Sequence, residues 1–276
     1  MRELGRVTIV IPCFNADIRL IRAYESAKTQ INVEVQVLII DDGSTDPRTK
    51  ELLGSLPTEV VVVKKQNQGL PAARNLGFSL AKTDYVLFLD ADDWLESNYL
   101  DEIMKRLPTN IELFFAYSDI QFEEERIGVK LAIYLPFSQR FLNQIPYCIL
   151  LNKKSFPLSY VYDESMTQGL EDWDLNIRLL ANNFMPIHIP SPLFHYSVSS
   201  MGMLQRVTLR NFHEVMNMIV LKNRPYYSVL SVLHAFRQQR KQFGAKSCTK
   251  GFLMWFFFFL FPGWMFNRII RWVAPS

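Results

Sequence analysis

The sequence of 276 residues is poor in features that mark several protein classes. Its three cysteines, Cys13, Cys148 and Cys248, lie far apart and form no Cys-x-x-Cys pair. This excludes a disulfide framework and a cysteine-based zinc site, and it favours a reducing compartment. The apolar segment 7–11 is too short, and is ended too soon by Pro12, to be the core of a signal peptide. We therefore expect the chain to stay in the cytoplasm.

Acidic residues are missing from the last part of the chain. All 27 acidic residues lie at or before Glu214, whereas nine of the 30 basic residues follow it. That leaves 21 basic against 27 acidic residues in the first part, a net charge of −6. An acidic body joined to a basic tail indicates that the two parts face different partners.

Long apolar runs are also scarce, and the one near the end of the sequence is interrupted. Residues 252–261 are almost all aromatic or aliphatic, but Pro262 and Gly263 separate them from residues 264–266. As a helix, these residues would reach about 22 Å, less than the roughly 30 Å hydrocarbon core of a bilayer. We predict that the segment 213–276 docks peripherally on the cytoplasmic face of an anionic cell membrane.

Two alternatives for this tail stay open. The apolar segment could close the hydrophobic core or an oligomer interface, or it could anchor the chain across a locally thinned bilayer. Before it, residues 209–219 and 229–236 carry apolar side chains at spacings of three and four. This spacing predicts two amphipathic helices, separated near Pro225.

What the sequence does contain is an alternation of apolar runs and helical segments, with 49% hydrophobic residues to fill a core. Strand followed by helix, repeated, predicts an α/β fold with a mainly parallel sheet and right-handed crossovers. The predicted strands are 7–11, 33–40, 60–63 and 85–89, and the predicted helices between them are 17–30, 46–54 and 70–81. Further along, we predict strands at 111–117 and 185–189, a helix at 171–183, and a loop punctuated by Pro186, Pro190 and Pro192 that carries residues 195–201.

Asp90-Ala-Asp92-Asp93 follows the fourth apolar run. In an open parallel sheet, ligands bind beyond the carboxyl ends of the strands, which is where this group falls. Carboxylates there suit Mg²⁺ or Mn²⁺, which shares one or two of them with substrate phosphates. Taken alone, the pattern is more typical of a helix N-cap before Trp94, but together with the other strand ends it favours a metal site.

Two more loops follow strands at the same predicted edge. Asp42, beside Gly43, could accept hydrogen bonds from a base or a ribose, although Asp-Gly is also ordinary turn chemistry. Arg74 lies near the start of the helix that follows Asn67-Gln-Gly69. It could hold phosphate, or form a structural ion pair with Asp90 or Asp42, and the two roles are compatible.

Together these motifs resemble the family 2 glycosyltransferases of the GT-A fold over about residues 6–200. The resemblance is carried by Val7 to Pro12 with Asn15, Asp41 to Asp46, Asn67-Gln-Gly69 with Ala73 to Gly77, Leu89 to Asp93, and Glu171-Asp172. It implies a GT-A domain over 1–212, with a nucleotide-sugar half at about 1–111 and an acceptor half at 112–212. The helical segment 213–276 would follow as the tail.

The resemblance also implies roles for individual residues. Asp42 would contact the nucleotide base, and Asp172 would be the catalytic base. Asp90 and Asp92 would form the Asp-x-Asp pair, with Asp92 the more direct ligand of Mn²⁺ or Mg²⁺. His195, in a loop that relatives bring to the diphosphate or the metal, is a further metal-ligand candidate. The predicted nucleotide-binding residues are Pro12, Phe14, Asn15, Asp42, Gly69, Arg74 and Asp90.

The implied reaction is a direct displacement with inversion. A metal would stabilise the departing diphosphate, and a base would deprotonate the attacking hydroxyl. The Gln-x-x-Arg-Trp signature of processive synthases is missing, which favours transfer of a single sugar. The expected partners are a UDP-sugar donor and a glycan or lipid-linked acceptor, without nucleic acid. Apart from the resemblance, Asp172 is an ordinary acidic residue in the first turn of a helix.

Two other functions are weighed against this one. A sugar nucleotidyltransferase would carry a Gly-rich phosphate loop after the first strand, but Pro12-Cys-Phe-Asn15 stands there. A membrane-associated glycan- or nucleotide-binding scaffold without activity is disfavoured because Asp42, Asp92 and Asp172 are all retained.

Overall fold

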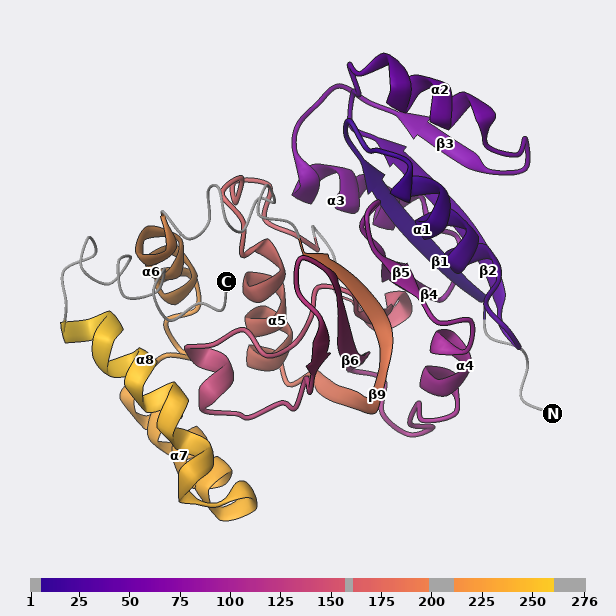
Figure 1. The fold of residues 1–276 in the computed structure, drawn as a ribbon. Helices are drawn as coiled ribbons and strands as arrows, with labels where there is room; N and C mark the ends of the chain where they lie inside the picture. The colour runs from indigo at the N-terminus through magenta and orange to yellow at the C-terminus, as the bar shows by residue number, and fades with distance from the viewer. Residues whose placement is uncertain (1–5, 157–160, 199–210, 261–276) are drawn as a thin grey trace. The chain divides into compact units, whose positions relative to one another are not determined.

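The structure is a computed structural model that describes residues 6–156, 161–198 and 211–260, with side chains as far as residue 256. The chain forms two compact units, each assembled from separate segments. Unit 1 comprises residues 1–132, 147–167 and 184–198, and unit 2 comprises residues 133–146, 168–183 and 199–276. The course of the chain can be followed by colour in Figure 1. The predicted boundaries near residues 111 and 212 remain predictions.

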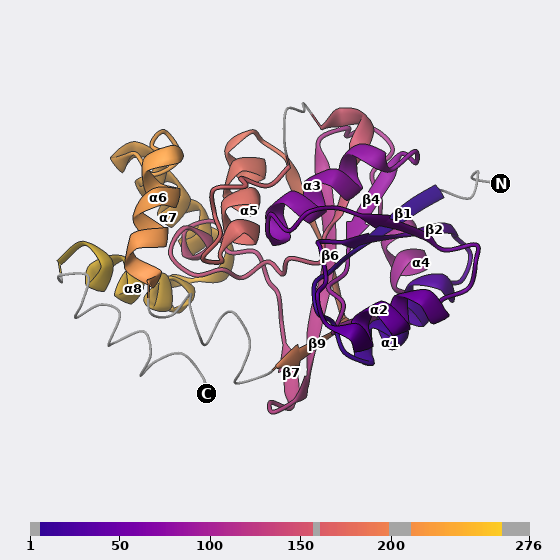
Figure 2. The ribbon, with the colours of Figure 1, turned by 90° about the horizontal axis from the view of Figure 1, so that it is seen from above.

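Unit 1 is built on one sheet. Among the described residues it has nine strands, in the order β3-β2-β1-β4-β8-β6-β9-β5, with β7 paired to β6. Strands β3, β2, β1 and β4 are mutually parallel, and so are β6 and β9. The antiparallel pairs are β4 with β8, β8 with β6, β5 with β9, and β6 with β7, and Figure 2 shows the last of these beside β9. The bounds are β1 Arg6–Cys13, β2 Glu34–Asp41, β3 Val61–Lys64, β4 Tyr85–Phe88, β5 Trp94–Leu95, β6 Phe114–Glu124, β7 Gly128–Lys130, β8 Leu150–Asn152 and β9 Met185–Val198.

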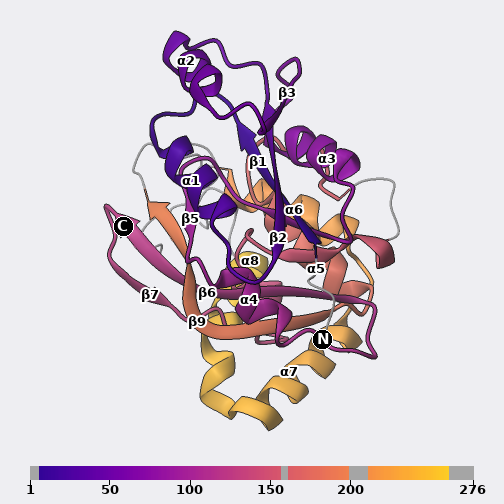
Figure 3. The same ribbon diagram turned by 90° about the vertical axis from the view of Figure 1, so that its right-hand side faces the viewer.

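The helices of unit 1 cover both faces of the parallel strands. Side chains alternate along β1, so Ile9 and Ile11 join the core cluster that contains Leu20 of α1, whereas Val10 meets Gly77 of α3. Figure 3 shows α1 and α3 on opposite sides of β1. A Cβ added to Gly77 would lie only 2.2 Å from Cγ1 of Val10, so glycine is what lets α3 approach the sheet. The helices are α1 Arg19–Lys28, α2 Pro47–Ser55, α3 Leu70–Leu80 and α4 Tyr99–Met104, with the short 3₁₀ helix η2 at Lys153–Ser155.

The strands and helices predicted for the first ninety residues are confirmed, each within two residues at either end. The reason is that strands buried on both faces must be almost continuously apolar, and β1 is buried at seven of its eight positions. The expected α/β class with a mainly parallel sheet is also confirmed.

The predicted proline-rich loop after residue 189 is wrong. Strand β9 continues through Pro190 and Pro192 as far as Val198, paired in parallel with β6. The pairing shifts register on either side of Asp119, which pairs with Pro192, and Pro190 falls in the first shift. Proline lacks an N–H, so it fits a sheet where the hydrogen-bond ladder is already interrupted by a bulge.

Unit 2 joins the helices of the tail to earlier segments. Gln239 of α7 is fully buried, and its side-chain oxygen accepts the backbone N–H groups of Phe137 and Ser138 at 2.9 and 3.0 Å. A Cβ on Gly251 would lie 2.9 Å from Cα of Ser138, so α8 also packs closely there. The elements of unit 2 are η1 Ser138–Arg140, α5 Glu171–Ala181, α6 Phe212–Lys222, α7 Val229–Phe243, η4 Ala245–Cys248 and α8 Thr249–Leu260.

The helices predicted at 171–183, 209–219 and 229–236 are confirmed as α5, α6 and α7 within the described residues. The part of the chain that the structure describes holds no helix with both the length and the apolar character needed to cross a membrane. Predicted features at residues 199–201, at residue 209 and at residues 261–276 lie outside the described residues.

Candidate functional site

The carboxyl ends of β1, β2 and β4 meet at one edge of the sheet, because these strands are parallel neighbours. Asp42, the first residue after β2, is buried there. Its carboxylate accepts the N–H groups of Gln68 at 3.0 Å and Gly69 at 2.8 Å, and it pairs with Nζ of Lys65 at 2.6 Å. Asp42 therefore fixes the loop between β3 and α3 at the edge where the predicted nucleotide site lies.

A second loop is fixed at the end of β1. The side-chain oxygen of Asn15 accepts the N–H groups of Thr45 at 2.8 Å and Asp46 at 2.9 Å, so it holds the connection between β2 and α2. Gly43 has a φ of +75°, and a Cβ there would lie 2.9 Å from the backbone nitrogen of Asn67. Phe14 is exposed beside these loops. The structure thus brings Pro12, Phe14, Asn15, Asp42 and Gly69 to one edge, as predicted.

Asp90 to Asp93 form a turn after β4, which we call the acid turn; the N–H of Asp93 bonds back to the carbonyl of Asp90 at 3.2 Å. The predicted structural pair of Arg74 with Asp90 is confirmed, with Nη2 of Arg74 2.6 Å from Oδ1 of Asp90. The helix-cap alternative for the acid turn is wrong, because the residues that follow it, Trp94 and Leu95, form β5.

Arg74 is itself enclosed. Only 1% of its surface is exposed, and its guanidinium carbon lies 4.9 Å from the ring centre of Tyr147 and 5.1 Å from that of Tyr162. The aromatic faces favour the cation and hold its position. Arg74 is therefore aimed at Asp90 before any ligand arrives.

Asp92 is the most exposed aspartate of the acid turn. Its side chain is 46% exposed, it accepts no hydrogen bond from another described residue, and Arg19 lies 4.0 Å away. Local burial and then the charge of Asp90 raise the pKa of Asp92 to about 6. A divalent cation would offset the repulsion between the carboxylates of Asp90 and Asp92. The charge of this pair therefore suits a divalent metal.

The acid turn offers two carboxylates, those of Asp90 and Asp92, to a metal. Within the described residues, no group of three or more histidine, cysteine, aspartate and glutamate side chains could hold a metal ion on its own. Mg²⁺ and Mn²⁺ are commonly held by one or two carboxylates together with substrate phosphates, rather than by a cage made only of protein. The acid turn matches that incomplete donor set.

Asp93 has a structural position that the sequence did not reveal. It is almost fully buried, one carboxylate oxygen accepts the N–H of Ser197 at 2.7 Å, and the other accepts the hydroxyl of Tyr147. Burial, with the charges of Asp92 and Asp90, raises the pKa of Asp93 well above its ordinary value. Burial also raises the pKa of Tyr147. Asp93 thus ties the acid turn to β9.

His195 lies in β9 and stacks on Trp94, with ring centres 3.4 Å apart. Its Nδ1 is 2.8 Å from Oε1 of Glu123, and its Nε2 is 2.8 Å from Oε1 of Glu96. Both ring nitrogens are therefore already within hydrogen-bond distance of a carboxylate oxygen. His195 thus bridges two glutamates, and its predicted role as a metal ligand stays a prediction.

Asp172 lies in unit 2, in the first turn of α5. The helix is preceded by Gly169 and Leu170, both with positive φ, which turn the chain sharply into it. Asp172 is half-buried, and Oδ2 accepts the side-chain amide of Asn143 at 2.8 Å. Asp174, two residues further along the helix, is fully buried and pairs with Arg178 at 2.8 Å. The two aspartates therefore differ: Asp174 is committed to an internal pair, whereas Asp172 is partly accessible.

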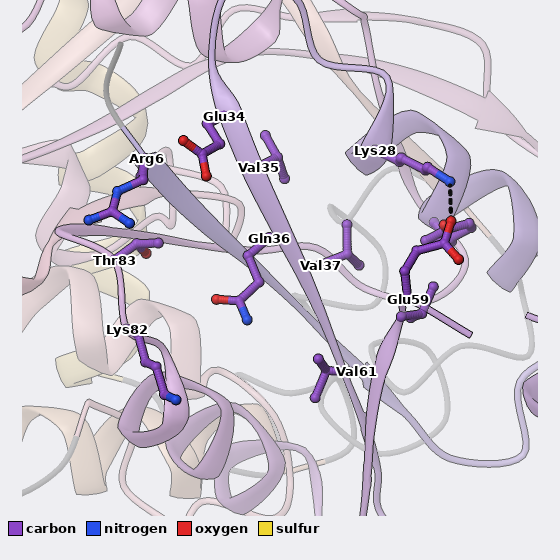
Figure 4. Close-up of a pocket in the computed structure, with 12 residues that line it drawn as sticks. Arg6, Lys28, Glu34, Val35, Gln36, Val37, Glu59, Val61, Lys82 and Thr83 are labelled. Atoms are coloured by element: carbon purple, nitrogen blue, oxygen red, sulfur yellow. Dashed lines mark hydrogen bonds and ion pairs between the residues drawn. The ribbon is translucent and has the colours of Figure 1, made fainter. Parts of the chain in front are cut away.

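Two of the pockets in the described part of unit 1 bear on the location of the site. One, of about 430 Å³, lies where β1 and β2 begin, away from the predicted site residues (Figure 4). Its wall mixes charges of both signs, including the 3.1 Å pair of Lys28 with Glu59. The other, of about 560 Å³, is lined by Asn15, Asp17 and Asp46, among others, near the carboxyl ends of β1 and β2. Only the second contains a predicted site residue.

Comparison with known proteins identifies the family. Residues 8–154, more than half of the chain, match the model of Glycosyl transferase family 2. The chain belongs to this family.

Relatives of this family 2 glycosyltransferase include the putative glycosyltransferase EpsH of Bacillus subtilis, 22% identical over 226 residues, which cover 76% of this chain and 66% of EpsH. Another is the Escherichia coli protein named UDP-Glc:alpha-D-GlcNAc-diphosphoundecaprenol beta-1,3-glucosyltransferase WfaP, 29% identical over 121 residues. That match covers 43% of this chain and 47% of WfaP. The chain thus spans less than two thirds of either relative.

A solved structure shares the fold. The crystal structure of Staphylococcus aureus TarS 1–349 in complex with UDP-GlcNAc aligns with a TM-score of 0.67, covering 95% of this glycosyltransferase and 79% of the TarS chain. The sequences are 16% identical, so this likeness shows the fold, which is the GT-A fold expected from the motifs.

Proposed function

We propose that this protein transfers a single sugar, with inversion, from a nucleotide-diphosphate sugar to a hydroxyl acceptor in a metal-dependent reaction. The observation that carries the proposal is the acid turn: Asp92 is its most exposed aspartate, and Asp90 is held by the buried Arg74. The acid turn follows β4, which lies beside β1 in the sheet. Asn15 lies just after β1, and Asp42 just after β2, the other neighbour of β1. A base, a ribose and a diphosphate can be held together at such an edge.

Each residue has a defined part in this reaction. Asp92, with Asp90, would hold Mn²⁺ or Mg²⁺, which when bound offsets the charge of the departing diphosphate. Arg74 keeps Asp90 in place, and the loop fixed by Asp42 would receive the base. Asp172 would take the proton from the acceptor hydroxyl, and Asn143 orients the carboxylate through Oδ2.

The proposal for the donor and the acceptor is supported by the names of similar proteins. The TarS crystal contains UDP-GlcNAc, and WfaP is named for a UDP-glucose donor and a diphosphoundecaprenol-linked acceptor. We propose a UDP-sugar donor here, with a surface-glycan precursor linked to a membrane lipid as the acceptor.

The direct test is donor binding followed by transfer. UDP-, GDP- and dTDP-sugars are screened by thermal shift with Mn²⁺ and with chelator; a ligand at 100 times its dissociation constant stabilises the fold by about 2.7 kcal/mol. Asp92→Asn should lose the Mn²⁺-dependent shift and the transfer. The matched control is Asp84→Asn, an exposed aspartate before the opposite end of β4. Full transfer in excess chelator, or equal loss in both variants, would overturn the metal assignment.

A lipid-linked acceptor lies in a membrane. We propose that the tail, residues 213–276, binds the enzyme to the cytoplasmic face of that membrane. No acidic residue follows Glu214, so this part attracts anionic lipid. On α7, Val229 and Leu230 are 75% and 81% exposed, so apolar side chains are available for insertion.

Because α8 packs on η1, deleting the tail would also remove support from unit 2. Substitution of exposed side chains is the cleaner test. Val229→Gln with Leu230→Gln should reduce flotation with anionic vesicles, and Leu131→Gln, at an exposed position of unit 1, should not. Unchanged flotation of the double variant, or equal binding to neutral vesicles, would reject docking by α7.

A further inference from the structure

The acid turn is held in shape by a residue far away in the sequence. Tyr147 comes 57 residues after Asp90, and its hydroxyl oxygen accepts the backbone N–H of Asp90 at 3.0 Å. The same hydroxyl donates to Oδ2 of Asp93. One buried hydroxyl therefore connects the first and the last residue of the turn.

The ring of Tyr147 acts on the same aspartate by a second route. The guanidinium of Arg74 lies over this ring at 4.9 Å and contacts the carboxylate of Asp90 at 2.6 Å. The backbone of Asp90 is thus fixed by the hydroxyl, and its side chain by a cation that the ring supports. The ring is itself held edge-on by Phe194 of β9, with centres 5.3 Å apart.

Ser197 completes the support. Its hydroxyl donates to the carbonyl of Asp92 at 2.5 Å, and its N–H donates to Asp93 at 2.7 Å. The backbone of the turn is therefore bonded on both sides, while the carboxylate of Asp92 accepts no hydrogen bond from another described residue. A rigid backbone under a carboxylate whose charged partner, Arg19, is no nearer than 4.0 Å is the arrangement expected where a ligand is to be met without reorganisation.

We propose that Tyr147 is a positioning residue that sets the spacing of the Asp90 and Asp92 carboxylates for a divalent cation and a diphosphate. This rests on the proposed function, since it assumes that the acid turn holds the metal. Tyr147 does not touch the metal; it acts through the N–H of Asp90 and through Asp93. The ordinary alternative is a core tyrosine whose loss affects only stability.

Tyr147→Phe removes the hydroxyl and keeps the ring under Arg74. The matched control is Tyr99→Phe, because Tyr99 is also buried in unit 1. Its hydroxyl donates to the carbonyl of Cys148 at 3.1 Å and accepts from Sγ of the same residue at 3.7 Å, and both contacts lie outside the turn. Both variants lose one buried tyrosine hydroxyl, so both should melt at a lower temperature than the wild type. Any difference between them reports on the acid turn.

The first readout needs no ligand. Amide hydrogen exchange should accelerate at Asp90 by about tenfold or more in Tyr147→Phe, because its N–H loses its acceptor. Leu89 is the internal reference: its N–H bonds to the carbonyl of Val10 at 3.0 Å and should stay protected. Tyr99→Phe should leave Asp90 as it is in the wild type. Equal exchange at Asp90 in the two variants would overturn the proposal.

The second readout is the affinity for Mn²⁺ in the presence of UDP, measured by titration calorimetry. Loss of an outer support of a metal site commonly costs 10–100-fold in affinity, and we expect that loss for Tyr147→Phe and not for Tyr99→Phe. Ser197→Ala, which frees the carbonyl of Asp92, should change affinity in the same direction. If the wild type binds Mn²⁺ with UDP and all three variants match it, Tyr147 has no positioning role and the proposed function stands. If the wild type binds neither Mn²⁺ nor UDP, the proposed function fails. The hydrogen exchange at Asp90 then decides alone whether Tyr147 fixes the acid turn.

Discussion

The carboxylate of Asp42 and the backbone N–H of Gly69 are joined at 2.8 Å across 27 residues of sequence. The same carboxylate also takes the N–H of Gln68 and the ammonium group of Lys65. A residue predicted to bind a base is therefore also the anchor of the loop that would lie beside that base. Its substitution should change stability and ligand binding together.

Asp42→Asn should lower the free energy of unfolding by about 1–3 kcal/mol, because an amide oxygen cannot replace both carboxylate oxygens as acceptors. Nucleotide affinity should fall in the same variant. Urea denaturation and UDP titration measure the two effects. Lys65→Met is the control, since it leaves both backbone donors bonded to Asp42 and should cost less. An Asp42→Asn protein as stable as the wild type would contradict the anchoring role.

Gly77→Ala should destabilise the protein by about 1–3 kcal/mol, because the new methyl group would press α3 away from Val10. Gly54→Ala is the matched control: this glycine is also helical, and a Cβ there meets nothing within 4 Å. That substitution should stabilise the helix by up to about 1 kcal/mol. Chemical denaturation measures the change in the free energy of unfolding for each variant. Changes of the same sign in the two variants would be inconsistent with this packing.

Asp172→Asn should reduce turnover by about 10²–10⁴-fold while donor affinity is kept, if the carboxylate accepts the acceptor's proton. Asp174→Asn tests the other aspartate of the same helical turn. Asp174 is fully buried and paired with Arg178, so that variant should lose stability instead. Single-turnover rates and thermal melts separate the two outcomes. Unchanged turnover in Asp172→Asn would assign Asp172 a structural charge only.

Burial raises the pKa of the Cys13 thiol from 9.0 to about 11. Below pH 9 the thiol is neutral in both the folded and the unfolded chain, so it adds no pH dependence. Between pH 9 and 11 the unfolded chain ionises and the folded chain does not, so stability falls as pH rises, by about 2–3 kcal/mol in total. Denaturation of the wild type against Cys13→Ala across this range isolates the effect. Parallel pH profiles of the two proteins would refute it.

The first half of the fold was predictable because its signals are local. Strands such as β1 are apolar at almost every position, and the polar residues that follow them fall at one edge once the strands are parallel. The prolines of β9 misled the prediction because a register shift, which depends on the partner strand, is what accommodates them.

The supports of the site were not predictable in the same way. Lys65, Tyr147 and Ser197 carry no motif, and they meet Asp42, Asp90 and Asp93 across 23, 57 and 104 residues. Sequence pattern reveals which residue types stand at strand ends, but partners at such separations are set by the folded sheet. The contacts of His195 with Glu123 and Glu96 are also long-range, across 72 and 99 residues.

The burial of Gln239 against Phe137 and Ser138 has a consequence for protein synthesis. Gln239 is made 102 residues after Phe137, which at roughly 5–20 residues per second is a delay of about 5–20 s. All segments of unit 1 are complete once residue 198 has been added, whereas unit 2 still lacks its last segment. During that interval the N–H groups of residues 137 and 138 lack the acceptor that Gln239 provides in the folded protein. The ribosome therefore completes unit 1 before unit 2. Helix α5, which carries Asp172, is incompletely packed until α7 has been synthesised.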